Sequence, residues 1–170
     1  MNLADYIRDV ADFPKPGILF KDITPLLANP VAFTHAIDLL TEHYRRHAID
    51  SIAAAEARGF LLAAPLAVAL NKPLIPLRKP GKLPYETISI KYDLEYGSNE
   101  LQMHTDSVKP GDKVLLVDDL LATGGTIHAA CELVEKAGGT VAGLGFLIEL
   151  AFLDGRAKLP GREIFSILTF

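Results

Sequence analysis

The apolar run Val114–Val117, which leads directly into Asp118 and Asp119, constrains the fold more than any other feature. A continuous apolar run is typical of a strand buried on both faces of a parallel sheet. Other strand-like segments, separated by helical patterns at 61–70 and from Thr126 on, are "SIAAAE", "KPLIPLRK", "TVAGLGFLIEL" and "IFSILTF". This alternation predicts an α/β fold, a mostly parallel twisted sheet with helices on both faces.

The rest of the chain predicts smaller elements. Apolar spacing indicates an amphipathic helix over 3–12, followed by an ordered loop with an extended piece at 18–20. Asn29 and Pro30 are typical of a helix start, with Asn29 as the N-cap and the helix running to about His47. Two alternating segments around a turn at 97–99 predict a β-hairpin over 86–106. We expect residues 1–170 to form one domain.

The acid pair predicts a polar site at one edge of the sheet. Ligands of parallel sheets bind beyond the carboxyl ends of the strands, where Asp118, Asp119 and Glu56 are all expected. Ionised carboxylates accept hydrogen bonds from sugar hydroxyls or hold a metal ion with its waters. The alternative is that the pair caps a helix or lies in a solvated loop.

The segment "ATGGT" follows the acid pair and is typical of a phosphate-binding loop. It consists of Ala122, Thr123, Gly124, Gly125 and Thr126. The two glycines allow backbone N–H groups to converge, and the helix that follows adds the partial positive charge of its N-terminus. The alternative is a plain glycine turn with Thr126 as the N-cap. Hydroxyl acceptors next to phosphate donors predict a site for a ribose 5-phosphate.

Several classes of function are disfavoured. The chain has no GxxxxGK[ST] motif, and the GxG at Gly143–Gly145 lacks the third glycine of a dinucleotide fingerprint. A net charge of −4 argues against a nucleic-acid-binding face. No apolar stretch is long enough to cross a membrane. With a single cysteine, Cys131, and no signal peptide recognised, a cytoplasmic protein is expected.

The histidines give no sign of a metal site with the cysteine. None of the five has metal-ligand spacing relative to Cys131, and we expect them to be structural or exposed. They are His35, His43, His47, His104 and His128.

Longer segments carry a resemblance to a known family. "VLLVDDLLATGGT" closely resembles the signature of the type I phosphoribosyltransferases, which bind 5-phosphoribosyl 1-diphosphate. The adenine-specific branch of that family is similar in four further segments, in the same order and over nearly the whole chain. These are "FPKPGILFKDITPLL", "EARGFLLAAPLA", "RKPGKLP" and "YDLEYGSNELQMH".

The resemblance implies a reaction and its partners. Adenine and 5-phosphoribosyl 1-diphosphate would give AMP and diphosphate in purine salvage, with Mg²⁺ held mainly by substrate and water and by no protein ligand directly. The transition state of such a transfer carries positive charge on the ribose ring, so anionic groups are needed there and cations at the leaving group. A homodimer is also implied, with no nucleic-acid or membrane partner.

The resemblance also implies roles for residues of the diphosphate end. Asp118 and Asp119 would be catalytic at the ribose, and Arg58 would bind diphosphate after a cis Ala57–Arg58 peptide. Ala57 stands where the family often has serine, which puts one side-chain contact in doubt. From "RKPGKLP", Arg78 and Lys82 would neutralise more of the diphosphate charge. The alternatives are a surface ion pair between Arg58 and Glu56 and a solvated basic loop.

Adenine and the closing loop complete the implied site. Leu19 and Lys21 would meet adenine through backbone groups and Phe20 would stack on it, within a hood formed by residues 1–30. Glu95, in a flexible hairpin loop, would exchange the proton of the base, and Tyr96 would pack over the diphosphate. The alternatives are a core position for Phe20 and a solvated hairpin position for Glu95.

Two other functions remain open from the sequence. The enzyme could use another base, such as xanthine, hypoxanthine or guanine. The 6-oxo group of these bases needs a hydrogen-bond donor from the protein, whereas the 6-amino group of adenine needs an acceptor. A transcription regulator that senses phosphoribosyl diphosphate would need a DNA-binding segment, for which 170 residues leave no room.

Overall fold

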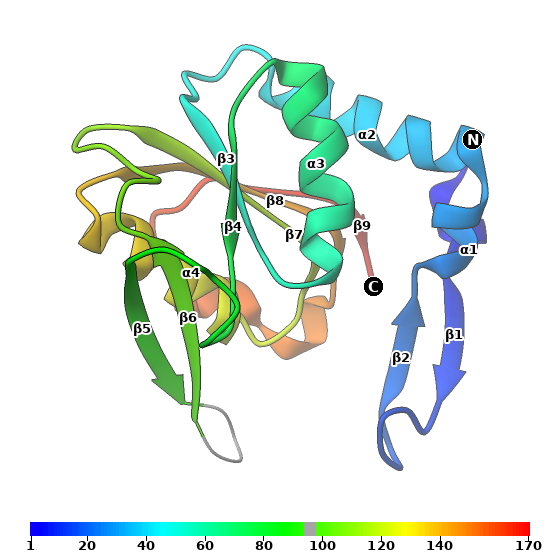
Figure 1. The fold of residues 1–170 in the computed structure, drawn as a ribbon. Helices are drawn as coiled ribbons and strands as arrows, with labels where there is room; N and C mark the ends of the chain where they lie inside the picture. The colour runs from blue at the N-terminus through cyan, green and yellow to red at the C-terminus, as the bar shows by residue number, and fades with distance from the viewer. Residues whose placement is uncertain (94–97) are drawn as a thin grey trace.

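A computed structural model describes residues 1–93 and 98–170, and its centre is a five-stranded sheet (Figure 1). The strand order is β4-β3-β7-β8-β9, and every neighbouring pair is parallel. The strands are β3 (Ser51–Ala55), β4 (Leu74–Leu77), β7 (Lys113–Leu121), β8 (Thr140–Glu149) and β9 (Ile164–Thr169). The predicted parallel α/β sheet is therefore confirmed.

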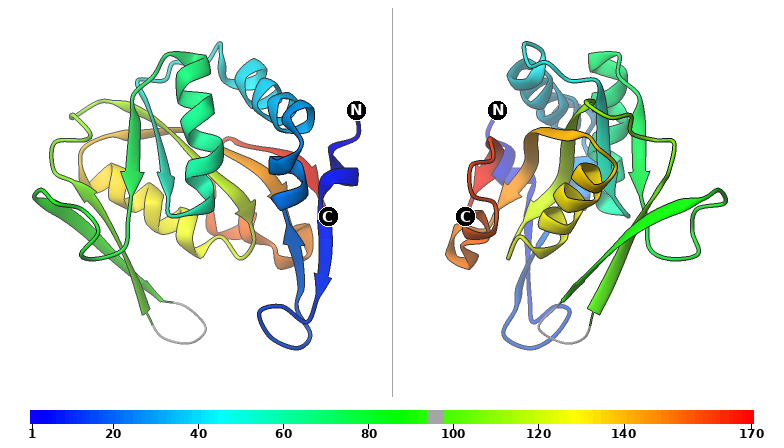
Figure 2. Two further views of the ribbon diagram at one scale, coloured as in Figure 1. Left: turned by 45° about the vertical axis from the view of Figure 1, so that its right-hand side comes forward. Right: turned by 90° about the vertical axis from the view of Figure 1, so that its left-hand side faces the viewer.

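Helices cover both faces of this sheet, as predicted (Figures 1 and 2). Helices α2 (Pro30–Tyr44) and α3 (Arg58–Leu70) pack on one face, and α4 (Gly125–Lys136) packs on the other. Alternate residues of β7 pack into the hydrophobic cores on opposite faces of the sheet. Leu115 and Val117 lie on the α2–α3 side, whereas Val114 and Leu116 lie on the α4 side. Burial on both faces explains why β7 reads as a continuous apolar run.

The N-terminal segment corrects the prediction of a helix over 3–12. Only Leu3–Tyr6 is helical, as the short 3-10 helix η1, and the chain then forms β1 (Arg8–Ala11). This strand pairs antiparallel with β2 (Leu19–Asp22). Opposite charges face each other across the pair, Arg8 to Asp22 and Asp9 to Lys21, and form ion pairs. Cross-strand pairing therefore outweighs the helical spacing beyond Tyr6.

The connection into α2 follows the prediction at its start. A short helix, α1 (Thr24–Ala28), precedes Asn29, whose side chain accepts hydrogen bonds from the backbone of Val31 and Ala32. Asn29 is thus the N-cap of α2, but the helix ends at Tyr44, earlier than His47. Helix α3 also differs from its predicted range: it starts at Arg58, before the predicted residue 61.

A second hairpin lies on the α4 side of the sheet, and both hairpins extend toward the same end of the molecule (Figure 1). It consists of β5 (Thr87–Asp93) and β6 (Ser98–His104), which pair antiparallel. The predicted turn at 97–99 is wrong for Ser98 and Asn99, because they pair with Asp93 and Tyr92 inside the ladder. Gly97 lies outside the described residues.

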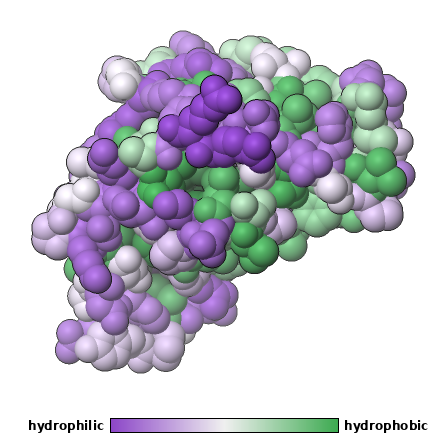
Figure 3. All heavy atoms as spheres, turned by 90° about the horizontal axis from the view of Figure 1, so that it is seen from above, coloured by the Kyte–Doolittle hydropathy of each residue, from purple (hydrophilic) through white to green (hydrophobic). Residues whose placement is uncertain are grey.

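Short 3-10 helices η2 (Ala151–Leu153) and η3 (Gly155–Lys158) connect β8 to β9. No helix within the described ranges is long and apolar enough to cross a membrane. Seen from above, hydrophilic residues occupy much of the surface, and hydrophobic ones gather in the middle and toward the right (Figure 3).

Removal of the Asn29 cap should destabilise the chain. Asn29→Ala leaves two backbone N–H groups at the start of α2 without their acceptor, so we expect the free energy of unfolding to fall by about 1 kcal/mol. Asn29→Ser, which restores a capping oxygen, should recover most of it. Urea denaturation measures both variants, and equal losses would show that the cap is not what stabilises this helix.

Candidate functional site

The candidate site lies where the direction of the sheet connections reverses. Strands β3 and β7 are neighbours, but β3 leads into α3 on one face and β7 leads into α4 on the other. Open α/β sheets bind ligands at such a switch point. One pocket here is lined by Glu56, Ala57, Arg58, the acid pair and Thr126, so the predicted meeting of Glu56 with Asp118 and Asp119 is confirmed.

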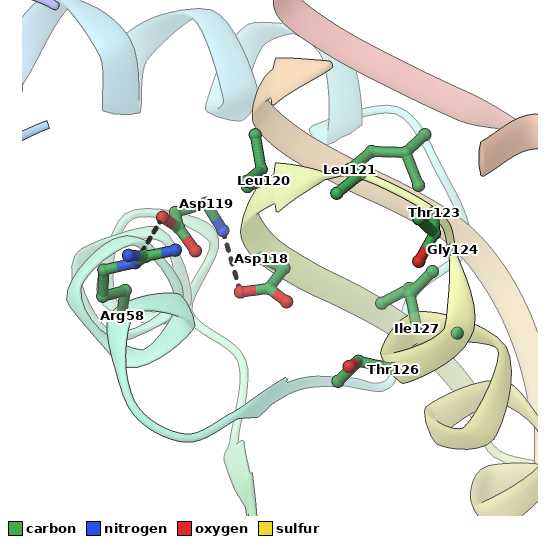
Figure 4. A pocket seen from close by; sticks show the side chains of 11 residues that line it. Arg58, Asp118, Asp119, Leu120, Leu121, Thr123, Gly124, Thr126 and Ile127 are labelled. Atoms are coloured by element: carbon green, nitrogen blue, oxygen red, sulfur yellow. Dashed lines mark hydrogen bonds and ion pairs between the residues drawn. The ribbon is translucent and has the colours of Figure 1, made fainter. Parts of the chain in front are cut away.

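The acid pair lies within β7, because the strand continues to Leu121. Asp119 is 5% exposed, and its backbone N–H donates to Asp118 Oδ1 at 2.9 Å. The two carboxylates point in different directions, yet both line the same cavity (Figure 4). Burial, followed by the charge of Asp119, raises the pKa of Asp118 well above its usual range. Asp118 is therefore short of positive charge and favours a ligand that supplies it.

Arg58 supplies the nearest cation. Its Nε lies 2.7 Å from Asp119 Oδ2, so the alternative ion pair with Glu56 is wrong. Its guanidinium also lies 5.1 Å from the ring centroid of Phe20. The cis peptide is Glu56–Ala57, one residue earlier than predicted, because Ala57 is the N-cap of α3 and Arg58 already belongs to the helix.

Gly59, in the first turn of α3, provides the space for this arrangement and was not predicted. A Cβ at Gly59 would lie 2.8 Å from Asp118 Oδ1, so any larger residue would displace the carboxylate. The first turn of a helix also stabilises negative charge. The glycine next to Arg58 in "EARGF" is the sequence feature that could have indicated this close approach.

The basic loop is connected to the site through Glu56. Its carboxylate accepts a hydrogen bond of 2.6 Å from the Lys79 backbone and lies 3.5 Å from Arg78 Nε. Arg78 in turn donates to the carbonyl of Lys82 at 3.4 Å. Lys82 itself is exposed. Arg78 is therefore anchored beside the switch point, and the side chain of Lys82 is not.

The predicted phosphate loop lines a cavity of about 190 Å³ together with Arg58 and the acid pair. All five residues of "ATGGT" take part, and so do three that were not predicted, Leu120, Leu121 and Ile127. Helix α4 begins at Gly125 with Gly124 as its N-cap at φ +82°, so Thr126 is not the cap. The Thr126 hydroxyl is instead 3.4 Å from Tyr92 Oη on the second hairpin.

A segment after β8 supports this loop from behind and was also not predicted. A Cβ on Gly155 would lie 2.3 Å from the Ala122 carbonyl oxygen, and one on Gly124 would lie 2.6 Å from the Gly155 carbonyl oxygen. The next residue, Arg156, binds the buried Glu149 through two hydrogen bonds of 2.6 and 2.7 Å. The loop thus rests on a glycine-to-glycine contact that an ion pair holds in place.

The predicted adenine residues lie on β2, apart from the two pockets of the acid pair. Phe20 is half-buried and packs edge-on against Phe13, which contradicts a core position. Lys21 Nζ binds Asp9 and lies 4.0 Å from the ring centroid of Phe170, while Leu19 is exposed. The contact between Arg58 and Phe20 is what connects β2 to the acid pair. Glu95 and Tyr96 lie outside the described residues.

Substitution of Gly155 should disturb the phosphate loop without touching ligand. In Gly155→Ala the new methyl group overlaps the Ala122 carbonyl, so the loop must shift. We expect the affinity for ribose 5-phosphate to fall at least ~10-fold, because phosphate binding depends on converging backbone N–H groups. Calorimetry measures the affinity. Gly161→Ala is the control for a strained glycine substitution away from the loop: its φ of +72° disfavours alanine, but a Cβ there would meet nothing within 4 Å, and it should bind normally.

Comparisons with known proteins agree with this geometry. Residues 22–161 match the family model of the phosphoribosyl transferase domain. The adenine phosphoribosyltransferase of Maridesulfovibrio salexigens is 60% identical over 168 residues, which cover 99% of each chain. The crystal structure of the enzyme from Thermoanaerobacter pseudethanolicus has a TM-score of 0.96 at 52% identity, covering 99% of this chain and 100% of that one.

The yeast enzyme, from Saccharomyces cerevisiae, was solved in complex with adenine and an imino-altritol bisphosphate; it has a TM-score of 0.92 at 39% identity and covers 98% of this chain and 96% of its own. With full-length relatives this similar and a domain match over most of its residues, the chain belongs to the adenine phosphoribosyltransferases of the phosphoribosyltransferase family.

Proposed function

We propose that this chain transfers the 5-phosphoribosyl group of 5-phosphoribosyl 1-diphosphate to adenine, giving AMP and diphosphate. The observation that carries the proposal is one cavity in which two carboxylates lie beside a glycine-rich loop at a helix N-terminus. Phosphate donors and hydroxyl acceptors at this spacing suit the two ends of a ribose 5-phosphate.

The acid pair would act on the ribose. As the bond from C1 to diphosphate breaks, positive charge develops on the ring, and fixed anionic groups stabilise it more than they stabilise the ground state. Asp118 and Asp119 supply these groups. The raised pKa of Asp118 supports this role, because a positive partner would return the carboxyl to its ionised form.

Magnesium fits the donor set of this cavity. Carboxylate oxygens suit a hard divalent cation that retains its waters, and Asp118 is short of positive charge, so Asp118 and Asp119 would hold Mg²⁺ through water while the substrate provides the direct ligands. When bound, the ion would neutralise charge on the diphosphate.

Arg58 would exchange partners during the reaction. Its guanidinium pairs with Asp119 in the structure, and a diphosphate is a stronger, bidentate acceptor for a guanidinium. Once Arg58 and the neighbouring Arg78 bind diphosphate, Asp119 becomes free to act on the ribose. Ala57 would contribute backbone contacts only, and Lys82 and Tyr96 would add contacts at the same end.

The base would bind against the first hairpin. Phe20 offers a ring face that Arg58 covers in the absence of ligand, and adenine would take that place with backbone contacts from Leu19 and Lys21. The side chain of Lys21 is engaged by Asp9, which supports recognition of the base by the Lys21 backbone instead.

Two properties of the whole protein complete the proposal. A cytoplasmic location suits a chain with one buried free cysteine. A homodimer is supported by Leu61 and Val68, 46% and 82% exposed, which lie two turns apart on α3. Sedimentation velocity that shows only monomers at micromolar concentration would contradict the dimer.

An assay with four bases tests the function directly. With 5-phosphoribosyl 1-diphosphate and Mg²⁺ we expect adenine to be favoured over guanine, hypoxanthine and xanthine by at least ~100-fold in kcat/KM, because mispaired buried polar groups are costly. Comparable turnover of hypoxanthine would assign a different base. No turnover of any base, with tight phosphoribosyl diphosphate binding, would indicate a sensor.

Arg58→Ala separates the diphosphate role from a structural one. We expect affinity for 5-phosphoribosyl 1-diphosphate to fall by at least ~10-fold more than affinity for AMP, which has no diphosphate to lose. Calorimetry with both ligands measures the difference. Equal weakening would mean that Arg58 acts through the position of Asp119 alone.

Glu95 would accept the proton that adenine loses when its ring nitrogen attacks C1. Glu95→Gln keeps the size of the side chain and removes proton exchange, so kcat should fall about 100-fold with little change in substrate binding. Rapid-quench kinetics over a range of pH measures this. A wild-type rate with an unchanged pH profile would refute the proton role.

A further inference from the structure

A second cluster of potential ligands lies at the opposite edge of the sheet from the acid pair. His43 lies in the last turn of α2, His47 lies three residues beyond the end of that helix, and Glu163 immediately precedes β9. One ligand atom from each lies within 4.8 Å of the other two. The backbone carbonyl of Glu163 accepts a hydrogen bond from the N–H of Leu144, in the middle of β8. Glu163 thus lies at the amino end of β9, whereas the acid pair lies near the carboxyl end of β7.

The surroundings hold this cluster in a defined arrangement. His43 Nε2 lies 2.7 Å from Glu163 Oε1, and the His43 ring stacks on Phe165 at 4.0 Å between centroids. The His47 ring stacks on the other histidine at 5.3 Å. Gly143 makes room for the carboxylate, since a Cβ there would lie 2.5 Å from Glu163 Oε2.

Two polar atoms beside the cluster lack a partner. Among the described residues, His47 Nδ1 and Tyr44 Oη are buried and have no hydrogen bond. An unsatisfied buried polar group costs about 1–3 kcal/mol, and a metal ion satisfies an imidazole lone pair as well as a hydrogen does.

The donor chemistry indicates which metal would fit. Two imidazoles and one carboxylate form a three-ligand zinc site with a fourth position for water, whereas Mg²⁺ prefers oxygen donors alone. The side chains of His43 and Glu163 are 31% and 41% exposed, which gives solvent access to that position. Rotation of the Glu163 side chain would bring the three groups onto one ion.

We propose that His43, His47 and Glu163 form a zinc site that joins the end of α2 to the start of β9. The site is distinct from the catalytic cavity and none of its groups has a role in the transfer reaction. Its effect is on stability, because an ion bound only by the folded chain raises the melting temperature.

The test uses the full chain without an affinity tag, stripped with a chelator and kept in saturating Mg²⁺ so that the acid pair is not available to zinc. Calorimetry with ZnCl₂ should give one equivalent of binding, and zinc should raise Tm. His47→Ala and Glu163→Gln should each lower zinc affinity at least ~10-fold, since even loss of an outer partner of a metal ligand costs that much. Both should keep the wild-type kcat.

The matched control is His35→Ala, which removes another histidine of α2 and should bind zinc normally. Circular dichroism verifies that each variant is folded. If His47→Ala does not fold, Glu163→Gln decides the outcome.

A visible Co²⁺ spectrum of a site containing imidazole, present in the wild type and lost in Glu163→Gln, would support the same ligands. No stoichiometric binding, or zinc binding unchanged in the folded variants, would overturn the proposal.

Discussion

The parallel pairing of β3 with β7 is the constraint on which the rest of this structure depends. It places Glu56 and Arg58, which follow one strand, against the acid pair near the end of the other. The two strands then lead to helices on opposite faces, which leaves the crevice between their ends open. The ion pair between Arg58, at the start of α3, and Asp119 forms across this crevice.

Close backbone approach is the second requirement of the site. Gly59 admits the Asp118 carboxylate, and Gly124 and Gly155 place the phosphate loop against the segment behind it. A Cβ at any of the three would lie under 3 Å from a backbone or carboxylate oxygen. The ion pair of Glu149 with Arg156 holds that supporting segment, so the shape of the predicted phosphate loop depends on residues that do not line the cavity.

The two hairpins serve the site from outside the sheet. The first brings Phe20 under Arg58, and the second brings Tyr92 next to Thr126. Neither hairpin is part of the main sheet. No residue in the strands of the first hairpin is buried, whereas the second hairpin buries Leu101 and Met103 in the core on the α4 side. The first hairpin therefore suits an element that must admit substrate, because weakly packed segments open at low free-energy cost.

The sequence by itself determined the parts of the protein that depend on local chemistry. The unbroken apolar run of β7 and the Asn29 cap formed as predicted, because burial on both faces and capping act within a few residues. The segment "ATGGT" leads into a helix as predicted, although α4 already begins at Gly125 inside it. Tertiary structure decided the remainder. Residues 3–12 have helical spacing, yet only 3–6 are helical and 8–11 form a strand that pairs with residues 19–22, and Arg58 pairs with Asp119 rather than with its near neighbour Glu56. The Gly155 support and the cluster of His43, His47 and Glu163 join segments far apart in the chain, and such contacts leave no periodic pattern in the sequence that could have predicted them.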